Sequence, residues 1–240
     1  VGGNQTLEKV TRNTLQVLEL VNKTDIPVVS GRQDPLFSSL SPASQIHGES
    51  GLNGPILKEP TTKAKDMNAC DFIAKCLKES DEKVVICAVG PLTNIGAFVL
   101  SYPDLLDKVE SFVIMGGGVY EGSRTPTAEF NVWQDPEAAK IVFNSGVYIH
   151  LFGLDVTHKN LVYPSDIEKF AEGGKVSGFI KDLMDFYAHT YMSVRKFNGC
   201  PIHDACAVAH IIDPTIFKGE EVFLDCEIES VVSRGSCIVD

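Results

Sequence analysis

The chain has 240 residues and a mass of 26.1 kDa, with 44% hydrophobic and 22% charged residues. These values are ordinary for a globular protein with one full core, and we expect a single domain over residues 1–240. The formal net charge of -11 disfavours nucleic-acid backbones and anionic membranes as partners, although a local basic patch is compatible with it. A small neutral substrate therefore fits this chain better than a polyanion.

Seven cysteines without C-x-x-C spacing favour reduced, buried thiols over a disulfide framework or a zinc site. The sequence shows no signal peptide and no apolar run of membrane-spanning length, so we expect a cytoplasmic protein. The chain begins at Val1 without a methionine and stops at Asp240 in what reads as a strand. We therefore expect it to be the middle of a longer protein, truncated at both ends.

The first half of the chain predicts two helices, two strands and a long loop. Residues 7–21 place apolar side chains near a 3.6-residue period, and a β-branched run follows at 26–29. Residues 32–65 are the longest irregular stretch, and such loops in compact domains are often functional. A second helical stripe covers 66–78, and the apolar run 84–89 predicts another strand.

The second half continues this alternation of strands and helices. It predicts a strand at 109–115, a helix at 135–143 that opens on a cap and a proline, and a strand at 147–154. Continuous apolar runs indicate strands covered on both faces, so the fold class is α/β with an open, mostly parallel, doubly wound (Rossmann-like) sheet. Ligands bind outside the carboxyl ends of such strands, where this chain is polar and glycine-rich.

The most informative segment is 202–209, because it sets His203 and Asp204 at the mouth of an apolar helix. An ionised aspartate there can ligate a hard cation such as Ca²⁺, and the histidine can move a proton near neutral pH. A buried histidine beside a helix-capping aspartate accounts for the same pattern without any chemistry. Other segments must decide between these interpretations.

Two further segments contain candidate ligand-binding side chains. His47 lies among glycines that let backbone approach a ligand closely, although turns also use glycine for local reasons. Glu129 and Asn131 stand two residues apart, on one side of an extended segment, and such a pair suits sugar hydroxyls. A solvated surface turn is the alternative for this pair.

Two common site motifs are missing. The glycine triplet 116–118 is not followed by a Lys-Ser/Thr pair, and the G-x-G-x-x-G spacing does not occur, so a nucleoside triphosphate site is not supported. The segment 48–51 does not match the G-x-S-x-G nucleophile elbow, which argues against a serine hydrolase.

Seven sequence blocks, taken in order, carry a family resemblance. They are Gly3–Thr6 with Leu7–Thr11, Ile46–Glu49, Gly90–Asn94, Met115–Gly118, Ala128–Asn131, Asp135–Ala139, and His203-Asp204 with Cys206–Ala209. In order and spacing they closely resemble the inosine-uridine-preferring nucleoside hydrolases, over nearly the whole chain.

The resemblance implies hydrolysis of the N-glycosidic bond of a ribonucleoside to ribose and free base. It also implies one Ca²⁺ that holds the attacking water and the ribose 2′ and 3′ hydroxyls, and a homodimer or homotetramer. The physical logic is sound, because a hard cation lowers the pKa of its water and carboxylates favour an oxocarbenium-like transition state.

The resemblance also assigns roles to individual residues. Asp204 would ligate Ca²⁺ near the ribose, and the main-chain carbonyl of Thr93 would supply another ligand. His203 would protonate or hydrogen-bond the leaving base. The ribose would be contacted by Asn4, Glu129, Asn131 and Met115, and the base by His47. Tyr187 and Tyr191, one helical turn apart, are candidates to stack on the base.

Two departures from the family pattern matter. The opening D-x-D-x-x-x-D-D motif, which supplies further Ca²⁺ ligands and the water-activating aspartate, would precede Val1, so we expect residues 1–240 alone to be inactive. Ser123 stands where many members have an asparagine that contacts the ribose 5′ hydroxyl. Substrate affinity is therefore the least constrained property.

Two other functions remain open at this point. The first is a non-catalytic relative that binds nucleoside or ribose, which Ser123 and the missing acidic motif suggest. The second is a structural or interaction protein that keeps only the fold, which the joint presence of Asn4, Glu129, Asn131 and His203 with Asp204 disfavours.

Overall fold

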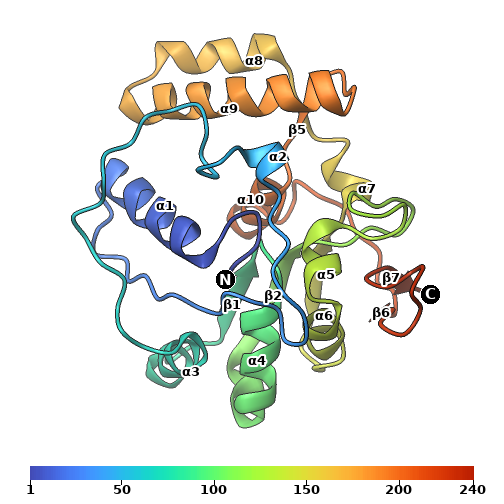
Figure 1. The fold of residues 1–240 in the computed structure, drawn as a ribbon. Helices are drawn as coiled ribbons and strands as arrows, with labels where there is room; N and C mark the ends of the chain where they lie inside the picture. The colour runs from blue at the N-terminus through green and yellow to red at the C-terminus, as the bar shows by residue number, and fades with distance from the viewer.

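A three-stranded parallel sheet organises the fold in the computed structural model, which describes residues 1–240 (Figure 1). Its strands are β1 (Val84–Ala88), β2 (Val109–Met115) and β3 (Ile149–Phe152), in this spatial order. Because the strands are parallel, their carboxyl ends lie at the same end of the sheet.

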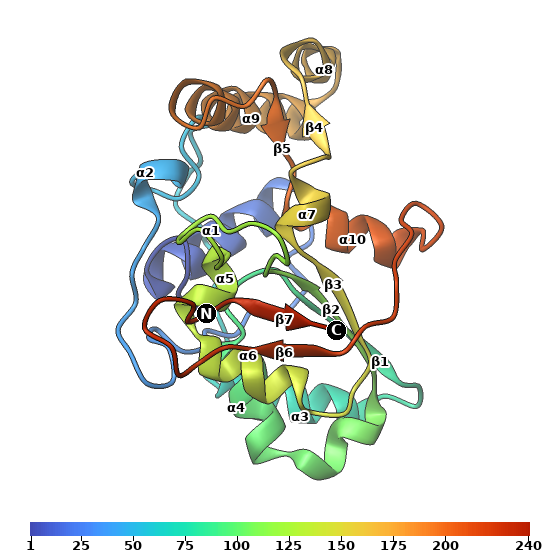
Figure 2. The same ribbon diagram turned by 90° about the vertical axis from the view of Figure 1, so that its right-hand side faces the viewer.

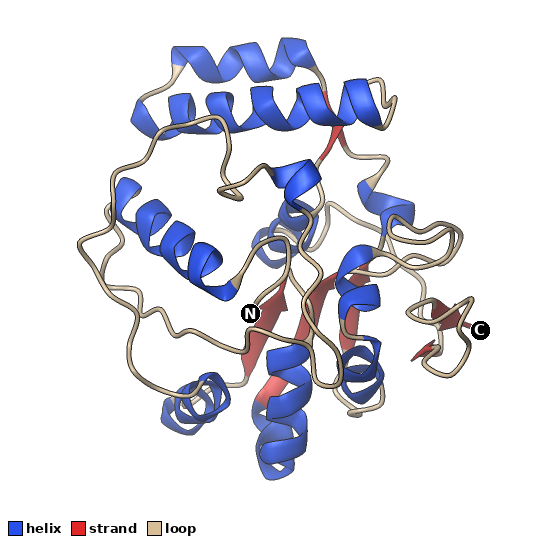
Figure 3. Cartoon of the chain, in the orientation of Figure 1, coloured by secondary structure: helices blue, strands red, loops and turns tan.

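Helices form most of the rest of the molecule (Figure 3). The α-helices are α1 (Leu7–Leu20), α2 (Ser44–His47), α3 (Ala69–Glu79), α4 (Thr93–Ser101), α5 (Phe130–Gln134), α6 (Pro136–Phe143), α7 (Leu154–Thr157), α8 (Pro164–Lys169), α9 (Lys175–Val194) and α10 (Asp204–Ile212). Short 3-10 helices span Pro103–Lys108 and Phe170–Glu172, and two antiparallel pairs are formed by β4 (Leu161–Val162) with β5 (Cys200–Pro201) and by β6 (Leu224–Cys226) with β7 (Cys237–Val239).

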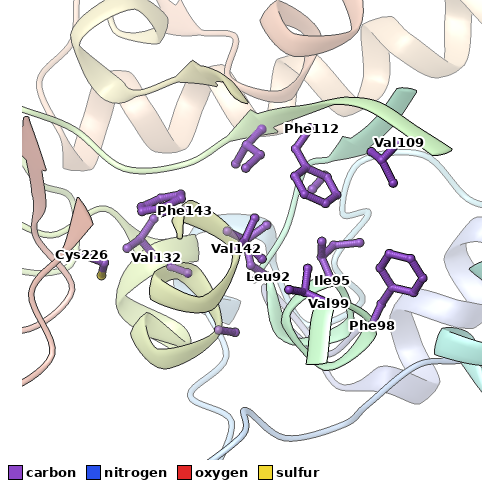
Figure 4. Packing of buried hydrophobic residues seen from close by; sticks show 14 of the residues in the cluster. Leu92, Ile95, Phe98, Val99, Val109, Phe112, Val132, Val142, Phe143 and Cys226 are labelled. Carbon is purple, nitrogen blue, oxygen red and sulfur yellow. The ribbon is translucent and has the colours of Figure 1, made fainter. Parts of the chain in front are cut away.

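Both faces of the sheet are covered by helices. Strand β2 shows this, because its alternate side chains point to opposite faces and enter two different clusters. Phe112 and Ile114 are buried in the larger core with residues of α3, α4 and α6 (Figure 4). Val113 and Met115 belong to a second cluster, which includes residues of α10. The predicted α/β class with a parallel sheet between helices is confirmed.

Helix caps explain why several helices begin where they do. The Asn68 side chain accepts a hydrogen bond from Cys70 N at 2.8 Å at the start of α3, and Asp135 accepts one from Ala138 N at 3.1 Å at the start of α6. Each cap satisfies a backbone donor that the helix leaves unpaired. The three predicted helices agree with α1, α3 and α6 to within three residues.

The predicted strand at 26–29 is wrong. This segment forms a single bridge, between Val29 and Lys65, and Ile26 is 49% exposed. A β-branched run becomes a strand only where a neighbour supplies a ladder of hydrogen bonds, and here Lys65 N donates to Val28 O as one isolated bond of 2.8 Å.

A helical layer lies beyond the carboxyl ends of the sheet. The long helix α9 runs beside α8, and α2 contacts α9 from below (Figures 1 and 2). Helix α2 is the one helix within the predicted loop 32–65. No helix combines the length and the apolar character needed to cross a membrane.

Candidate active site

A cavity of about 650 Å³ lies at the carboxyl ends of the strands, with residues of α2, α9 and the start of α10 in its wall. Its lining includes the predicted residues Asn4, His47, Met115, Ser123, Glu129, Asn131, His203 and Asp204, together with Tyr187 and Tyr191. Thr93 is the one predicted site residue that does not line it. The fold therefore brings together side chains that are up to 200 positions apart in the sequence.

Glu129 is the cap of α5 and is fixed by backbone groups. One carboxylate oxygen, Oε2, accepts hydrogen bonds from Asn131 N at 2.8 Å, Gly117 N at 2.9 Å and Val132 N at 3.2 Å. The other oxygen, Oε1, has no protein partner. Burial raises the pKa of Glu129 to about 7, against the lowering effect of the three backbone bonds. This carboxyl is therefore rigid and presents one free oxygen.

Asn131 is oriented by the last residue of β2. Its Nδ2 donates to the Met115 carbonyl oxygen at 3.0 Å and lies 3.5 Å from the Met115 sulfur. The amide nitrogen is thereby occupied inside the protein, while the amide oxygen has no protein partner. Asn131 thus presents a hydrogen-bond acceptor of fixed direction beside Glu129.

Asp204 is the first residue of α10 and opens on the cavity. Its carboxylate has no hydrogen-bond partner in the protein, and its residue is exposed to the cavity solvent. The surrounding protein desolvates the group and raises the pKa of Asp204 to about 6. An unpartnered carboxylate in such a place is available to a cation or to a ligand hydroxyl.

His203 is held at both ring nitrogens. Nδ1 lies 2.8 Å from Thr157 Oγ1, and Nε2 lies 3.0 Å from the Tyr191 hydroxyl. Burial lowers the pKa of His203 to about 4, and the neighbouring His158 and His47 contribute to this lowering. The ring is therefore neutral at pH 7, so one contact donates and the other accepts.

Aromatic rings continue from His203 along the cavity wall. Tyr191 contacts Tyr187 edge-on at a centroid distance of 4.7 Å, and Tyr187 stacks on His47 at 5.8 Å. Burial also lowers the pKa of His47, to about 4. The four rings give one part of the cavity flat apolar faces with polar edges, which suits a planar heterocycle.

A family model for inosine-uridine preferring nucleoside hydrolases matches residues 1–240. The chain belongs to this family. It is an enzyme of the nucleoside hydrolase class, which splits ribonucleosides into ribose and free base, as the sequence blocks predicted.

Individual nucleoside hydrolases agree with this assignment. The chain is 44% identical, over 240 residues, to the pyrimidine-specific ribonucleoside hydrolase RihA of Escherichia coli O1:K1, and the match covers 99% of this chain and 77% of RihA. A purine-preferring ribonucleoside hydrolase from Gardnerella vaginalis superposes with a TM-score of 0.94 at 30% identity, over 99% of this chain and 77% of the other. The plant nucleoside hydrolase PpNRh1 gives a TM-score of 0.93 at 28% identity, over 100% and 76% of the two chains.

The structure of this nucleoside hydrolase places Thr93 in the core. Its hydroxyl donates to Asp135 Oδ2 at 2.6 Å, and the residue is 1% exposed. The residue that lines the cavity at the end of β1 is Val89, whose carbonyl accepts no hydrogen bond in the protein. Val89 was not predicted as a site residue, although its position as the last residue of the predicted strand 84–89 was a usable signal.

Sequence analysis also missed the two cations of the cavity wall, Arg124 and Arg195. Arg124 directly follows Ser123, and Arg195 ends α9 one turn after Tyr191. The carboxylates of the wall are Glu129 and Asp204 alone, and residues 1–240 hold no group of three or more His, Cys, Asp or Glu placed to bind a metal ion.

Proposed function

We propose that this cavity binds a ribonucleoside and is the place where its N-glycosidic bond is hydrolysed. The proposal rests on one observation: the same cavity holds both hydrogen-bonding oxygens and aromatic rings. Free oxygens of Glu129, Asn131 and Asp204 suit a polyol, and a run of histidine and tyrosine rings suits a base.

At the ribose end, the proposal gives the polar side chains hydrogen-bonding roles. Glu129 Oε1 and the Asn131 amide oxygen accept bonds from ribose hydroxyls, and the Asn4 amide, which has no protein partner, completes the contacts. Met115, 3% exposed, packs against the sugar. The carboxylates beside the ring also favour the positive charge that the ribose gains as the bond to the base breaks.

At the base end, His203 and Tyr191 handle the proton of the leaving group. A departing base must gain one proton, and the water that adds to C1′ gives one up, so the hydrogen-bonded pair of His203 and Tyr191 would pass a proton to the base and regain one before the next turnover. Tyr187 and His47 contact the face and edge of the base. In this role His203 affects bond cleavage and leaves ribose binding to other residues.

We further propose that the enzyme is a Ca²⁺ enzyme, as the family resemblance implies, with Asp204 as one ligand and the Val89 carbonyl, rather than that of Thr93, as another. When bound, the ion would orient water and lower its pKa. Ca²⁺ takes about 6–8 oxygens, and two do not make a site. The described residues alone therefore do not fit the ion, and the roles given to Glu129, Asn131 and His203 do not depend on it.

We propose pyrimidine ribonucleosides as the better substrates. The support is the 44% identity to a pyrimidine-specific enzyme, against 30% to a purine-preferring one. The kcat/KM for uridine and cytidine should exceed that for inosine, measured by base release under identical conditions. A higher kcat/KM for inosine than for both pyrimidine nucleosides would overturn this preference.

The test of the function is ribose release from uridine by the full-length protein, with and without a chelator. We expect turnover that EDTA abolishes and added Ca²⁺ restores. Turnover that resists EDTA would contradict the metal role. Uridine binding without any turnover would instead favour the non-catalytic relative.

Two properties of the whole protein are also proposals. We propose a cytoplasmic location, which the seven free cysteines support because cytosolic thiols stay reduced.

We propose a homodimer or homotetramer, as the resemblance implies. Light scattering on the purified full-length protein would measure this oligomeric state.

A further inference from the structure

Thr157 is a buried polar side chain directly behind His203. It is the last residue of α7, is 0% exposed and does not line the cavity, which leaves it out of substrate contact. Its hydroxyl oxygen lies 2.8 Å from His203 Nδ1, and this is the one hydrogen bond that the Thr157 side chain forms. The hydroxyl is therefore placed to act on the imidazole ring and on nothing else.

Backbone hydrogen bonds fix α7 against the segment that carries His203. Helix α7 follows β3 and leads into β4, which pairs with β5 (Figure 2). Between these elements, Ile202 N donates to Asn160 O at 2.9 Å. Since Ile202 directly precedes His203, and Asn160 lies three residues after Thr157, the contact between the hydroxyl and the imidazole is held from both sides.

The burial of Thr157 decides which partner donates in this contact. A hydroxyl donates one hydrogen bond and also accepts, and a neutral imidazole has one N–H and one acceptor nitrogen. If Nδ1 carried the hydrogen, the Thr157 oxygen would accept, and its own hydrogen would be left without an acceptor in a place closed to water. An unpaired buried donor is costly, so the favoured arrangement has Thr157 donating to Nδ1.

This direction places the imidazole proton on the other ring nitrogen. His203 is neutral at pH 7 because burial lowers its pKa to about 4, and with Nδ1 as the acceptor its hydrogen is on Nε2. Nε2 lies 3.0 Å from the Tyr191 hydroxyl, and both residues line the cavity. The pair then holds its two transferable protons, on Nε2 and on the Tyr191 oxygen, on the cavity side. In the other tautomer one of them would lie on Nδ1, behind the ring.

We propose that Thr157 is a positioning residue that holds His203 in the tautomer with its proton on Nε2. The inference rests on the proposed function, in which His203 and Tyr191 pass a proton to the leaving base. As the C1′–N bond breaks with its electron pair going to the base, one proton moves from this pair to the base, and the pair regains one from the water that adds to C1′. Thr157 fixes only where the imidazole proton starts.

The first experiment locates the proton directly, by NMR of the imidazole nitrogens in the full-length protein. The His203 signals are those that disappear from the spectrum of His203→Ala. We expect a protonated Nε2 and an unprotonated Nδ1 in the unliganded protein at pH 7. A proton on Nδ1 would overturn the inference and leave the proposed function intact, because that function requires only that the pair can pass a proton.

The second experiment removes the hydroxyl and keeps the shape of the side chain. In Thr157→Val the imidazole proton should be shared between Nδ1 and Nε2, and kcat for uridine should fall about tenfold with little change in KM, the loss of one hydrogen bond. A p-nitrophenyl riboside, whose leaving group needs no proton, should lose much less. Thr157→Ser keeps the hydroxyl and should retain both the tautomer and the rate of the parent.

Thr190→Val is the matched control, because Thr190 is also a buried threonine, 8% exposed, whose hydroxyl donates to Phe186 O of its own helix at 3.3 Å. It should leave the ratio of the two rates unchanged. Equal losses for uridine and the riboside in Thr157→Val, or the same loss in Thr157→Ser, would overturn the inference. Absence of uridine turnover in the parent protein would instead overturn the proposed function, and the NMR measurement would still decide the tautomer.

Discussion

At the scale of residues, the Asp204 carboxylate is the group on which most of the proposed chemistry depends. It lines the cavity and has no partner in the protein, so its removal leaves the core unchanged but deletes a carboxylate from the site. We expect Asp204→Ala to abolish ribose release, by a factor of about 10³ or more, as for other essential catalytic groups. Asp182→Ala, an exposed aspartate outside the cavity, is the control and should retain activity.

His203 should affect substrates according to their leaving groups. His203→Ala should lower kcat/KM for uridine by about 10²–10⁴-fold, the usual contribution of a general acid. A p-nitrophenyl riboside leaves without needing a proton, so its rate should fall much less. Equal losses for both substrates would mean that His203 does not supply the proton.

Tyr191→Phe provides a second test of the same pair. It removes the hydroxyl bonded to His203 Nε2 and keeps the ring that packs on Tyr187. We expect a loss in the same direction as for His203→Ala, and smaller. If uridine and the nitrophenyl riboside respond alike, the hydroxyl has no part in leaving-group protonation.

Most side chains with chemistry of their own could be found from the sequence, whereas a backbone carbonyl is marked only by its position. The reactive groups and their order along the chain indicated Glu129, Asn131 and His203, and the structure places all three in the wall of one cavity. Val89 contributes a carbonyl that every residue has, so no residue type marks it. Arg195 could be assigned only once the path of α9 was known, because the end of that helix depends on tertiary packing.

At the scale of elements, the glycine triplet after β2 positions Glu129. Gly117 has φ +73°, and a Cβ there would lie 2.4 Å from Cys237 Sγ. Gly146 has φ +79° with open space around it. Gly117→Ala should therefore cost about 2 kcal/mol more than Gly146→Ala, since it adds overpacking to the same backbone strain. The measurement is urea unfolding of both variants.

A double variant makes the source of this difference testable. Cys237→Ala removes the sulfur that the new methyl group meets, so Gly117→Ala should be less costly in that background. An unchanged cost would show that the conflict with Cys237 is not what makes Gly117 necessary.

Glu19 ties α1 to the loop at 61–62 and gives a pH-dependent stability. Its Oε1 accepts bonds from Thr61 N and Thr62 N, both at 2.7 Å, and the bonds to Thr62 and Thr61 lower the pKa of Glu19 to about 2. A lowered folded-state pKa means stability that is present above the ordinary value near 4.5 and is lost as pH falls toward 2.

Glu19→Gln should therefore lower the melting temperature at pH 7, and the difference from the parent should shrink between pH 4.5 and 2. Glu79→Gln serves as the control for an exposed helical glutamate. A melting-temperature difference that is independent of pH would contradict the proposed role of the carboxylate.

Elements were predictable where local signals were strong. The start of α6 directly after Asp135 was predicted from its cap and proline, whereas the predicted helix at 66–78 began before Asn68, the residue that caps α3. The run at 26–29 has the composition of a strand, but its ladder depends on a neighbouring segment that composition does not reveal. No strand forms there, because strand pairing is a property of two segments and only one of them has the required pattern.

At the scale of the whole molecule, residues 1–240 hold no cluster of three or more side chains that could bind a metal ion. Asp204 and one carbonyl supply too few oxygens, so this segment alone should show no saturation up to about 1 mM Ca²⁺, the weak end of protein calcium sites. Isothermal titration of the purified segment measures this. Saturable micromolar binding would show that the described residues suffice.

The central claim is that the cavity at the carboxyl ends of the sheet binds ribose, because every proposed residue role depends on this binding. The most direct measurement is a crystal structure of the full-length protein with ribose and Ca²⁺. We predict ribose hydroxyls within hydrogen-bonding distance of Glu129, Asn131 and Asp204. Ribose bound elsewhere, with this cavity filled only by water, would contradict that prediction.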